Sequence, residues 1–469
     1  MNKKRLAVNI LALCYIPVAF AGGILTNTNQ SARFARLMAL EASTQYADAA
    51  YYNPAGTIKL SEGFHFTFSN QSAFQKRIIN ASSPLFAGSI DGQMNKEYVG
   101  TASAPIIPSI QGVYKKGQWA LSGSLAVTGG GGKATFNKGL SMFEMAGAAV
   151  PGLVNKFGAP SKADRYVMDQ YMTGSNFIYG AQIGGAYEIN KMFSVYGGFR
   201  LNIVNNKYEG YLKNLQTNWT PSGMSSPSAL FDQVIAKLEA TGGAQEDINN
   251  LFLLSKAGSA DGAQLESKQS GWGISPIVGF NFSYNKLNIG AKYEFKTSLN
   301  VENKTIIDDT GKNNTGMFGN GVNSDHDIPA LFTIGASYQV LPQLSLSVGY
   351  HRFFDKDAQM DKGKQKYLDG DTNEYLFGAE YQINKMFLVS AGGQVTRYGI
   401  GDGFQSDLSF SVNSYSLGFG GAVNVSKNVQ INVGYFYTDY TDYTIETAAI
   451  NKTYTRKNKV FSAGVDFSF

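Results

Sequence analysis

The last nine residues alternate strictly between two kinds of side chain. One set is apolar and the other is small or polar; the first is Phe461, Ala463, Val465, Phe467 and Phe469, and the second is Ser462, Gly464, Asp466 and Ser468. Because successive side chains of a strand point to opposite faces, this pattern predicts a strand with one apolar and one polar face. Strands that separate lipid from water have this pattern.

The same two-residue period recurs over 64–69, 193–202, 332–338 and 431–438. The composition agrees, because 53 Gly, 31 Phe and 27 Tyr with only 16% charged residues suit extended β structure. Beyond residue 21 no apolar run reaches the ~20 residues that a membrane helix needs. A membrane chain without such runs has to close its strands into a barrel, so that every backbone group is paired. The sequence therefore predicts an all-β membrane protein.

Short and long connections alternate along the chain, and they give a strand count. Six short turns are expected near Lys116-Gly117, Asn190-Lys191, Asn285-Lys286, Leu341-Pro342, Asn384-Lys385 and Lys427-Asn428. Seven longer polar or glycine-rich segments separate the hairpins. Residues 187–193 and 381–387 are nearly identical, as two equivalent turns would be. The prediction is an antiparallel transmembrane β-barrel of about 14 strands over residues 62–469, with both ends periplasmic.

The first 21 residues have the three parts of a secretory signal peptide. A basic start, Lys3-Lys4-Arg5, precedes a mostly apolar stretch over 6–20, and small residues allow cleavage after Ala21. Its removal would lower the formal net charge from +5 to +2. The charges form no basic block, so no nucleic-acid partner is expected.

Cys14, the only cysteine, lies within this segment. A lipoprotein would be the alternative, but Leu13 stands where a small residue is expected before the lipidated cysteine. After cleavage the chain would contain no disulfide and no thiolate ligand for a metal.

Two loops are long enough to contain structure. The segment 129–170 begins with four glycines and contains an apolar run over 142–154, and the segment 213–269 has apolar residues at helical spacing. Short amphipathic helices outside the membrane are therefore expected in both. Either they simply pack the loops, or they form an apolar groove that first binds a hydrophobic ligand.

Residues 22–61 do not have the pattern of a membrane strand. Residues 31–41 have helical character, and the motif Asn53-Pro54-Ala55-Gly56 precedes the first strand. Pro54 restricts Asn53 to extended geometry and Gly56 permits a turn. The lumen of a 14-stranded barrel is wide enough to take such a segment as a plug.

The motif Asn53-Pro54-Ala55-Gly56 and the preceding stretch over 48–52 resemble the FadL/TodX family of outer-membrane transporters of long-chain fatty acids and aromatic hydrocarbons. The spacing from signal to motif to first strand, the strand number and the terminal Phe469 extend the resemblance over essentially the whole mature chain. It implies that residues 22–61 are a hatch that blocks the lumen. It also implies a kink in the third strand, through which ligand leaves sideways into the bilayer. That strand is expected over about 118–128, with the distortion at Gly123.

The resemblance implies a non-enzymatic monomer, without cofactor, in the outer membrane of a Gram-negative bacterium. Its ligands would be hydrophobic small molecules, either long-chain fatty acids or hydrocarbons. Lipopolysaccharide makes the outer leaflet a poor solvent for diffusing lipids, so such ligands need a protein path. The aromatic end at Phe469 resembles the signal that the barrel assembly machinery recognises in its clients.

Three inward-facing cations are candidates for binding a fatty-acid carboxylate: Arg200, Lys292 and Lys296. Since Lys292 and Lys296 flank Glu294 on the same strand face, the alternative is an ion-pair ladder that makes the barrel rigid. If these cations bind the carboxylate, replacing Arg200 or Lys292 by Ala should weaken fatty-acid binding and leave hydrocarbon binding unchanged.

The sequence indicates neither catalysis nor metal binding. The three histidines, His65, His326 and His351, show no pairing with a serine that would indicate a hydrolase. Adjacent Asp325, His326 and Asp327 are poorly spaced to converge on one metal, so no metal site is expected. A general porin or a surface adhesin with loop-mediated binding is the alternative function. An open porin would lack the N-terminal plug.

Overall fold

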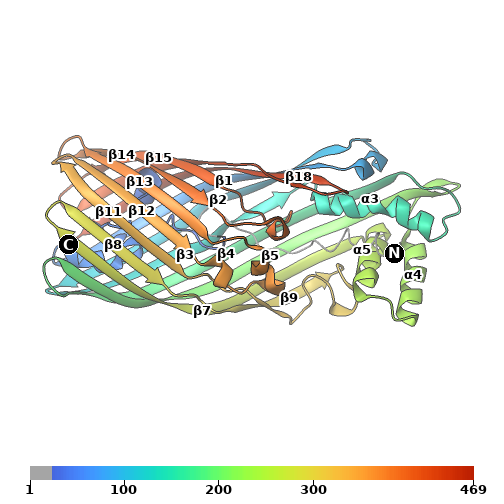
Figure 1. Cartoon of the computed structure of the whole chain (residues 1–469), viewed down its shortest axis with the longest axis horizontal. Coiled ribbons are helices and arrows are strands. Elements are labelled where there is room, and N and C mark those ends of the chain that lie inside the picture. Colours follow the sequence, from blue (N-terminus) through green and yellow to red (C-terminus); the bar gives the residue numbers. More distant parts are fainter. Residues whose placement is uncertain (1–23) are drawn as a thin grey trace.

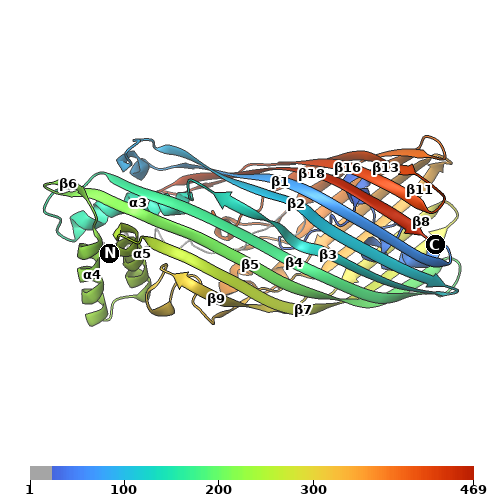
Figure 2. The same cartoon turned by 180° about the vertical axis from the view of Figure 1, so that it is seen from behind.

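The computed structural model describes residues 24–469, which form a closed, elongated β-barrel (Figures 1 and 2). The expected signal peptide, residues 1–21, lies outside the described residues. Within the described part of the chain, no helix is both long and apolar enough to cross a membrane.

Within residues 24–469, eighteen strands make one continuous sheet. Two short strands, β6 (Gly223–Ser225) and β17 (Tyr443–Glu446), pair with the ends of longer ones. β8 (Leu287–Glu294) and β9 (Asn300–Asp308) both pair with β7 (Ala263–Tyr284), so β9 continues β8 along the same barrel strand. Likewise, β10 (Asn323–Asp325) precedes β11 (Leu331–Leu341). Fourteen antiparallel strands therefore surround the lumen, as the sequence predicts.

The remaining barrel strands fall into a long and a short group. The long ones are β1 (Gly63–Ser82), β2 (Asn95–Lys116), β3 (Trp119–Phe136), β4 (Tyr166–Glu188), β5 (Phe193–Thr220) and β18 (Asn451–Ser468). The short ones are β12 (Leu344–Phe353), β13 (Thr372–Gln382), β14 (Phe387–Arg397), β15 (Ser414–Asn424) and β16 (Val429–Tyr440). A membrane crossing needs about 9–11 residues of strand, so the short strands just span it and the long ones continue beyond.

The barrel closes where β1 pairs with β18 over 18 residues of each strand. The terminal residue takes part, because Phe469 N–H donates to the Phe64 carbonyl and Phe64 N–H donates to the Phe469 carbonyl. The six predicted short turns are confirmed at the end of the barrel that holds Phe469.

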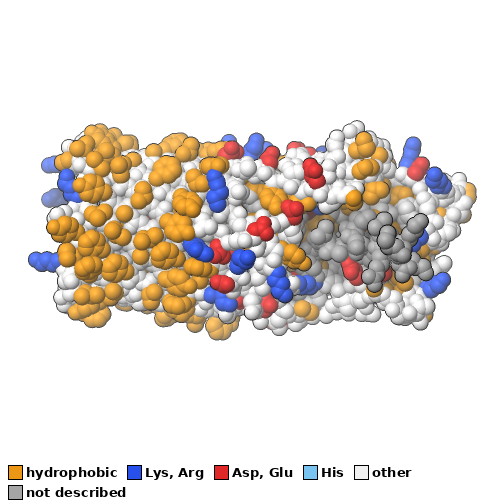
Figure 3. Space-filling view, viewed as in Figure 1, with side chains coloured by type: hydrophobic (Ala, Val, Ile, Leu, Met, Phe, Trp, Pro, Cys, Tyr) orange, Lys and Arg blue, Asp and Glu red, His pale blue; other side chains and the backbone are white. Residues whose placement is uncertain are grey.

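The two-residue alternation is confirmed as an inside–outside pattern. On β18, Phe461 is exposed on the outside while Ser462 and Asp466 are buried toward the lumen. Apolar side chains cover the outer surface of the half of the barrel with short turns, with a few Lys and Arg side chains at its very end and further charged residues on the other side of the apolar zone (Figure 3). This half has the lipid-facing belt of a transmembrane barrel.

Helices lie at the opposite end, where the long connections are (Figures 1 and 2). The helix α3 (Ser141–Lys156) lies between β3 and β4, and α4 (Ser228–Ala240) and α5 (Gln245–Gly258) lie between β5 and β7. The strands extend further into both segments than expected. The first loop covers only 137–165 instead of 129–170, because the strand pairing continues beyond the apolar belt. Single 3-10 turns fill other loops: η3 (Pro84–Gly88), η4 (Lys312–Asn314), η5 (Asp355–Asp357), η6 (Asp361–Tyr367) and η7 (Asp402–Phe404).

Residues 24–61, called the hatch below, pack inside the barrel. They form α1 (Ala32–Leu37), α2 (Ala49–Tyr52) and the 3-10 helix η2 (Pro54–Lys59). Ser31 caps α1 by accepting from the Phe34 N–H at 3.2 Å. The helix α1 contacts β13, β14, β15, β16 and β18, whereas η2 contacts β3, β4, β5, β7 and β8. The hatch therefore extends across the lumen from wall to wall.

Glycines of the wall make room for the hatch. A Cβ atom added at Gly392 or Gly378 would lie 2.1 or 2.3 Å from the Leu37 carbonyl oxygen, and one at Gly290 would lie 2.0 Å from the Glu41 carbonyl oxygen. The others whose added Cβ would lie less than 3 Å from a hatch atom are Gly129, Gly335, Gly349, Gly418, Gly420 and Gly434. Part of the high glycine content thus serves hatch packing, in addition to strand curvature.

We expect Gly392→Val to displace the hatch around Leu37 and to lower the free energy of unfolding by about 1–3 kcal/mol. Gly197→Val is the matched control, because an added Cβ there meets no atom within 4 Å. Heat-modifiable gel mobility measures the barrel, and limited proteolysis measures release of the hatch. Equal stability of the two variants would contradict close packing at Gly392.

Candidate functional site

The motif Asn53-Pro54-Ala55-Gly56 anchors the hatch. The Asn53 side chain accepts from the Gly56 N–H at 3.2 Å and donates to the Ser43 carbonyl at 3.1 Å and to Asn281 Oδ1 of β7 at 2.8 Å. A Cβ atom at Gly56 would lie 2.3 Å from Asn53 Nδ2, so only glycine fits there. The motif joins a local turn to the wall.

Further polar contacts hold the hatch to several strands. Wall side chains donate to hatch carbonyls: Gln182 to Ala50 at 2.8 Å, Ser194 to Ala55 at 2.8 Å, Asn288 to Ala42 at 2.9 Å and Lys292 to Tyr51 at 2.7 Å. Arg36 of α1 forms an ion pair with Glu380 of β13 and donates to Asn432 of β16. Because these contacts come from many strands, the hatch is held as a plug.

The three predicted carboxylate-binding cations each contact a carboxylate of the chain itself. Arg200 Nη2 lies 3.0 Å from Glu294 Oε1, and Lys292 Nζ lies 2.7 Å from the same oxygen. Lys296 pairs with Asp327 at 3.1 Å in a more exposed position. Arg200 and Lys292 also lie over the Tyr51 ring of the hatch, at 4.9 and 4.6 Å from its centroid. This geometry favours the ion-pair ladder over direct ligand binding.

We therefore expect Arg200→Ala to weaken oleate and n-alkane binding equally, while destabilising the barrel by about 3–5 kcal/mol, as loss of one partner of a buried pair does. Tryptophan fluorescence titration with both ligands, alongside thermal unfolding, measures this. A loss restricted to oleate would instead assign Arg200 to the carboxylate.

A break in the wall lies between β2 and β3. The two strands pair up to Ser109–Ala126, and pairing resumes only at Ser103–Lys133. Opposite β4, the register of β3 shifts between Val127 and Gly129 and again between Gly130 and Gly132. The third strand is therefore distorted, but the predicted position at Gly123 is wrong.

Gly123 lies in regular pairing with Gly112 of β2 and Ile183 of β4. The distortion lies further along because β2 carries Pro105 and Pro108 there, and proline has no N–H to donate to a neighbouring strand. The facing segment of β3, residues 129–132, is all glycine. This juxtaposition of prolines and glycines is a signal in the sequence, but a run of four glycines on its own predicts the start of a loop.

Hatch residues donate hydrogen bonds to β3 where its pairing with β2 is missing. Asn27 N–H donates to the Thr128 carbonyl at 2.8 Å, and its side chain donates to the Gly130 carbonyl at 2.6 Å. The Gln30 side chain donates to the Val127 carbonyl at 3.0 Å. We call residues 24–30 the seal. Behind it, a cavity of about 30 Å³ is lined from both sides of the break by residues including Ala104 and Gly130.

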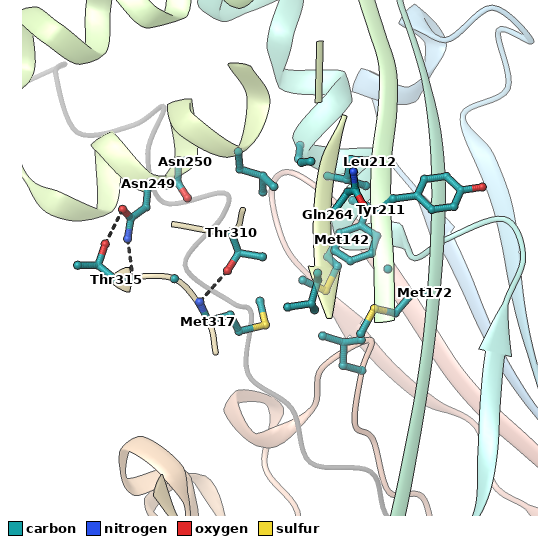
Figure 4. Close-up of a pocket in the computed structure, with 18 of the residues that line it drawn as sticks. Met142, Met172, Tyr211, Leu212, Asn249, Asn250, Gln264, Thr310, Thr315 and Met317 are labelled. Atoms are coloured by element: carbon teal, nitrogen blue, oxygen red, sulfur yellow. Dashed lines mark hydrogen bonds between the residues drawn. The ribbon is translucent and has the colours of Figure 1, made fainter. Parts of the chain in front are cut away.

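A larger cavity of about 470 Å³ lies among the external loops. In Figure 4, Met142 and Met172 lie on one side of it and Asn249 and Asn250 of α5 lie on the other. Asn249 also donates to the Thr315 carbonyl at 2.9 Å. The predicted loop helices α3 and α5 thus both contribute to an amphipathic cavity.

An apolar cluster continues from this cavity into the outer part of the lumen. Met172, Leu265 and Leu408 belong to both, and the cluster also includes Tyr208, Phe318, Phe410, Tyr440 and Tyr454. Next to it, Arg77 of β1 and Arg456 of β18 are directly paired in register and buried. Arg77 donates to Gln75 at 3.0 Å, and the Arg456 guanidinium lies 4.6 Å from the Phe410 ring centroid. The sequence alone does not predict this cationic pair, because it depends on the register of the first and last strands.

The histidines lie in three different settings. His65 contacts Ser468 Oγ and the Ser61 carbonyl, at 3.0 and 2.8 Å, and His351 lies between Glu41 and Glu374. Burial lowers the pKa of His326, in the external part of the chain, to about 4, against the opposing effect of Asp327. Among residues 24–469, no three His, Cys, Asp or Glu side chains are grouped as ligands for a metal.

Comparison with solved structures places the fold. The chain is similar to a FadL homologue from Pseudomonas aeruginosa, with 13% identity, a TM-score of 0.63, and coverage of 96% of this chain and 100% of that one. It is also similar to the toluene transporter TodX from Pseudomonas putida, with 15% identity, a TM-score of 0.55, and coverage of 94% and 99%. For the toluene transporter TbuX from Ralstonia pickettii the values are 17%, 0.50, 90% and 94%.

No family model matches the sequence, and no curated protein matches it. The structural comparisons nevertheless confirm, at the level of the fold, the resemblance expected from the sequence. The chain has the architecture of a multi-pass outer-membrane β-barrel. The similar structures are named as transporters and not as enzymes.

Proposed function

We propose that this barrel takes up hydrophobic molecules, in particular long-chain fatty acids, and releases them sideways into the membrane. The observation that carries the proposal is the break between β2 and β3, which is closed from inside by the seal. On the outer face, apolar Ile106, Phe74 and Tyr179 border the break and are exposed. A ligand that displaced the seal would therefore reach lipid.

The arrangement of cavities supports a path in this direction. The 470 Å³ loop cavity is continuous with the apolar cluster of the outer lumen, through Met172, Leu265 and Leu408. The small cavity behind the seal is lined by Gln75 of β1 and Asn458 of β18. Each of these residues is two positions from one member of the Arg77–Arg456 pair on the same strand. Each methylene of an acyl chain gains about 0.8 kcal/mol on burial, so the apolar side chains of the cavity and the cluster favour binding of an acyl chain.

Displacing the seal has a definite cost. Within a bilayer, a backbone carbonyl without a hydrogen-bond donor is unfavourable by several kcal/mol, and the seal satisfies those of Val127, Thr128 and Gly130. The path is therefore closed at rest. It opens only while a bound ligand compensates for the lost contacts, which agrees with the gating role of mobile segments in other proteins.

A disulfide tests the direction of release. The Cβ atom of Ala55 lies 3.6 Å from the position of a Cβ atom added at Gly279 of β7, within the range of disulfides. We expect Ala55→Cys/Gly279→Cys to take up labelled oleate equally well when oxidised or reduced, because the lock fixes the far end of the hatch and leaves the seal free.

The host for this assay is a bacterium that lacks its own fatty-acid transporter, and each single-cysteine variant is the control. Uptake that stops on oxidation and returns on reduction would refute sideways release and favour passage through the hatch. Absence of uptake by the unmodified chain, despite a correctly inserted barrel, would refute fatty acids as the ligand.

The Arg77–Arg456 pair gives the proposal its specificity for a carboxylate. Two adjacent guanidinium groups in a lumen of low dielectric constant favour an anionic headgroup. Since a hydrogen bond to a charged group contributes about 1.5–3 kcal/mol, we expect Arg77→Gln/Arg456→Gln to weaken oleate binding about 10- to 100-fold. Binding of an n-alkane should not change. An equal loss of affinity for both ligands would show that the carboxylate does not bind at this site.

A general porin or a surface adhesin is the competing function. A porin requires an open aqueous lumen, whereas here the hatch contacts strands on all sides of the barrel. Planar-bilayer conductance separates the two: an open porin gives large steady currents, and the proposed channel gives none. An adhesin would show the same low conductance but no oleate uptake.

A further inference from the structure

A buried histidine joins the hatch to the wall between two carboxylates. His351 Nε2 of β12 lies 2.8 Å from Glu41 Oε1 of the hatch, and its Nδ1 lies 2.8 Å from Glu374 Oε2 of β13. All three side chains are at most 2% exposed. The wall is shaped for this contact, because a Cβ atom at Gly349 would lie 2.1 Å from Glu41 Oε2.

Both contacts of His351 can be satisfied together only if the three groups hold an additional proton. An ionised carboxylate only accepts hydrogen bonds, and a neutral imidazole has one N–H and one lone pair. A neutral His351 can therefore satisfy only one of its two carboxylates. The other ring nitrogen would direct its lone pair at an oxygen 2.8 Å away.

The neighbours of Glu374 locate that proton. Its second oxygen, Oε1, accepts from Gln394 at 2.7 Å and from Thr396 at 3.0 Å, both of β14. Three donors thus hold Glu374 as an ionised acceptor, and His351 Nδ1–H is one of them. The additional proton accordingly lies between His351 Nε2 and Glu41 Oε1, at the contact between wall and hatch.

Among the ion pairs beside this contact, the charges balance only with this proton, and a further buried neighbour, Asp355, interacts electrostatically with Glu374 and supplies no cation. The neighbouring network consists of Lys292, Arg200 and Glu294, assembled around Tyr51 of the hatch. Lys292 interacts electrostatically with Glu41. With the proton present, these six groups comprise three cations and three anions. Without it, a net negative charge is buried, which is strongly unfavourable.

We propose that Glu41, His351 and Glu374 form a proton-dependent latch that fastens the hatch to the barrel wall. When the proton between His351 Nε2 and Glu41 Oε1 is lost, the ring lone pair and the carboxylate oxygen repel each other and separate. The latch is therefore closed in acidic solution and released in alkaline solution. The inference rests on the proposed function only in treating the hatch as the element that moves. The latch residues act on hatch position and are not ligand-binding groups.

A distance measurement without ligand tests the latch. Gln45, four residues from Glu41, and Lys385, in the turn between β13 and β14, are both exposed. Spin labels on Gln45→Cys/Lys385→Cys, with Cys14→Ser to remove the only native cysteine, report the position of this part of the hatch by electron–electron double resonance. We expect one narrow distance in acidic buffer and a broad distribution in alkaline buffer.

Glu41→Gln is the decisive variant. Its amide donates to Nε2 of a neutral ring while Nδ1–H donates to Glu374, so no additional proton is needed. We expect the narrow distance at both pH values. His351→Phe should give the broad distribution at both. His65→Gln is the matched control, because His65 contacts a hydroxyl and a carbonyl and no carboxylate; it should behave as the unmodified chain.

Two results would overturn the latch: a distance distribution in the unmodified chain that does not change with pH, or the same pH response in Glu41→Gln. Since Glu41→Gln is nearly isosteric, its barrel should fold even if His351→Phe does not. Because no ligand is present, a negative result here is distinct from failure of oleate uptake, which would count against the proposed function alone.

Discussion

Backbone hydrogen bonding in lipid is the constraint on which the whole structure depends. A barrel satisfies it by closing β1 onto β18, through to the contact between Phe64 and Phe469. It can be broken only where another donor is supplied. Between β2 and β3 the strand pairing stops, and Asn27 and Gln30 of the hatch supply donors instead. The hatch is therefore a part of the wall at this position as well as a plug of the lumen.

Glycines of the wall explain how the hatch can pack closely inside the barrel. Where the hatch backbone approaches the wall, glycines such as Gly290 and Gly392 leave no side chain between them. The polar atoms that this close approach buries are then paired, for example by the Lys292 donor to the Tyr51 carbonyl. Close packing and polar satisfaction together hold the hatch in place, and the movements proposed above begin at two positions, the seal and His351.

Charged side chains inside the lumen lie in two different settings. Arg200 and Lys292 share Glu294, and this network positions the hatch. Arg77 and Arg456 lie instead beside the apolar cluster, among Gln75, Tyr208 and Phe410. The strand period predicts that Arg200 and Lys292 face inward. It does not show which strand lies opposite, because pairing between residues nearly 400 positions apart is set by barrel closure.

The sequence by itself determined the barrel, since a two-residue period fixes which face of each strand is apolar and the alternation of short and long connections fixes the strand number. It also indicated the hatch, because 40 residues without a strand pattern precede the first strand and contain Asn53-Pro54-Ala55-Gly56. Only the tertiary structure decided where the wall is broken. Gly123 and residues 129–132 are equally permissive glycines, and the difference is that Pro105 and Pro108 of the neighbouring strand lie opposite the second group. Only the tertiary structure could bring Glu41 to His351, because a contact between a plug and a wall depends on how the chain folds back into its own lumen.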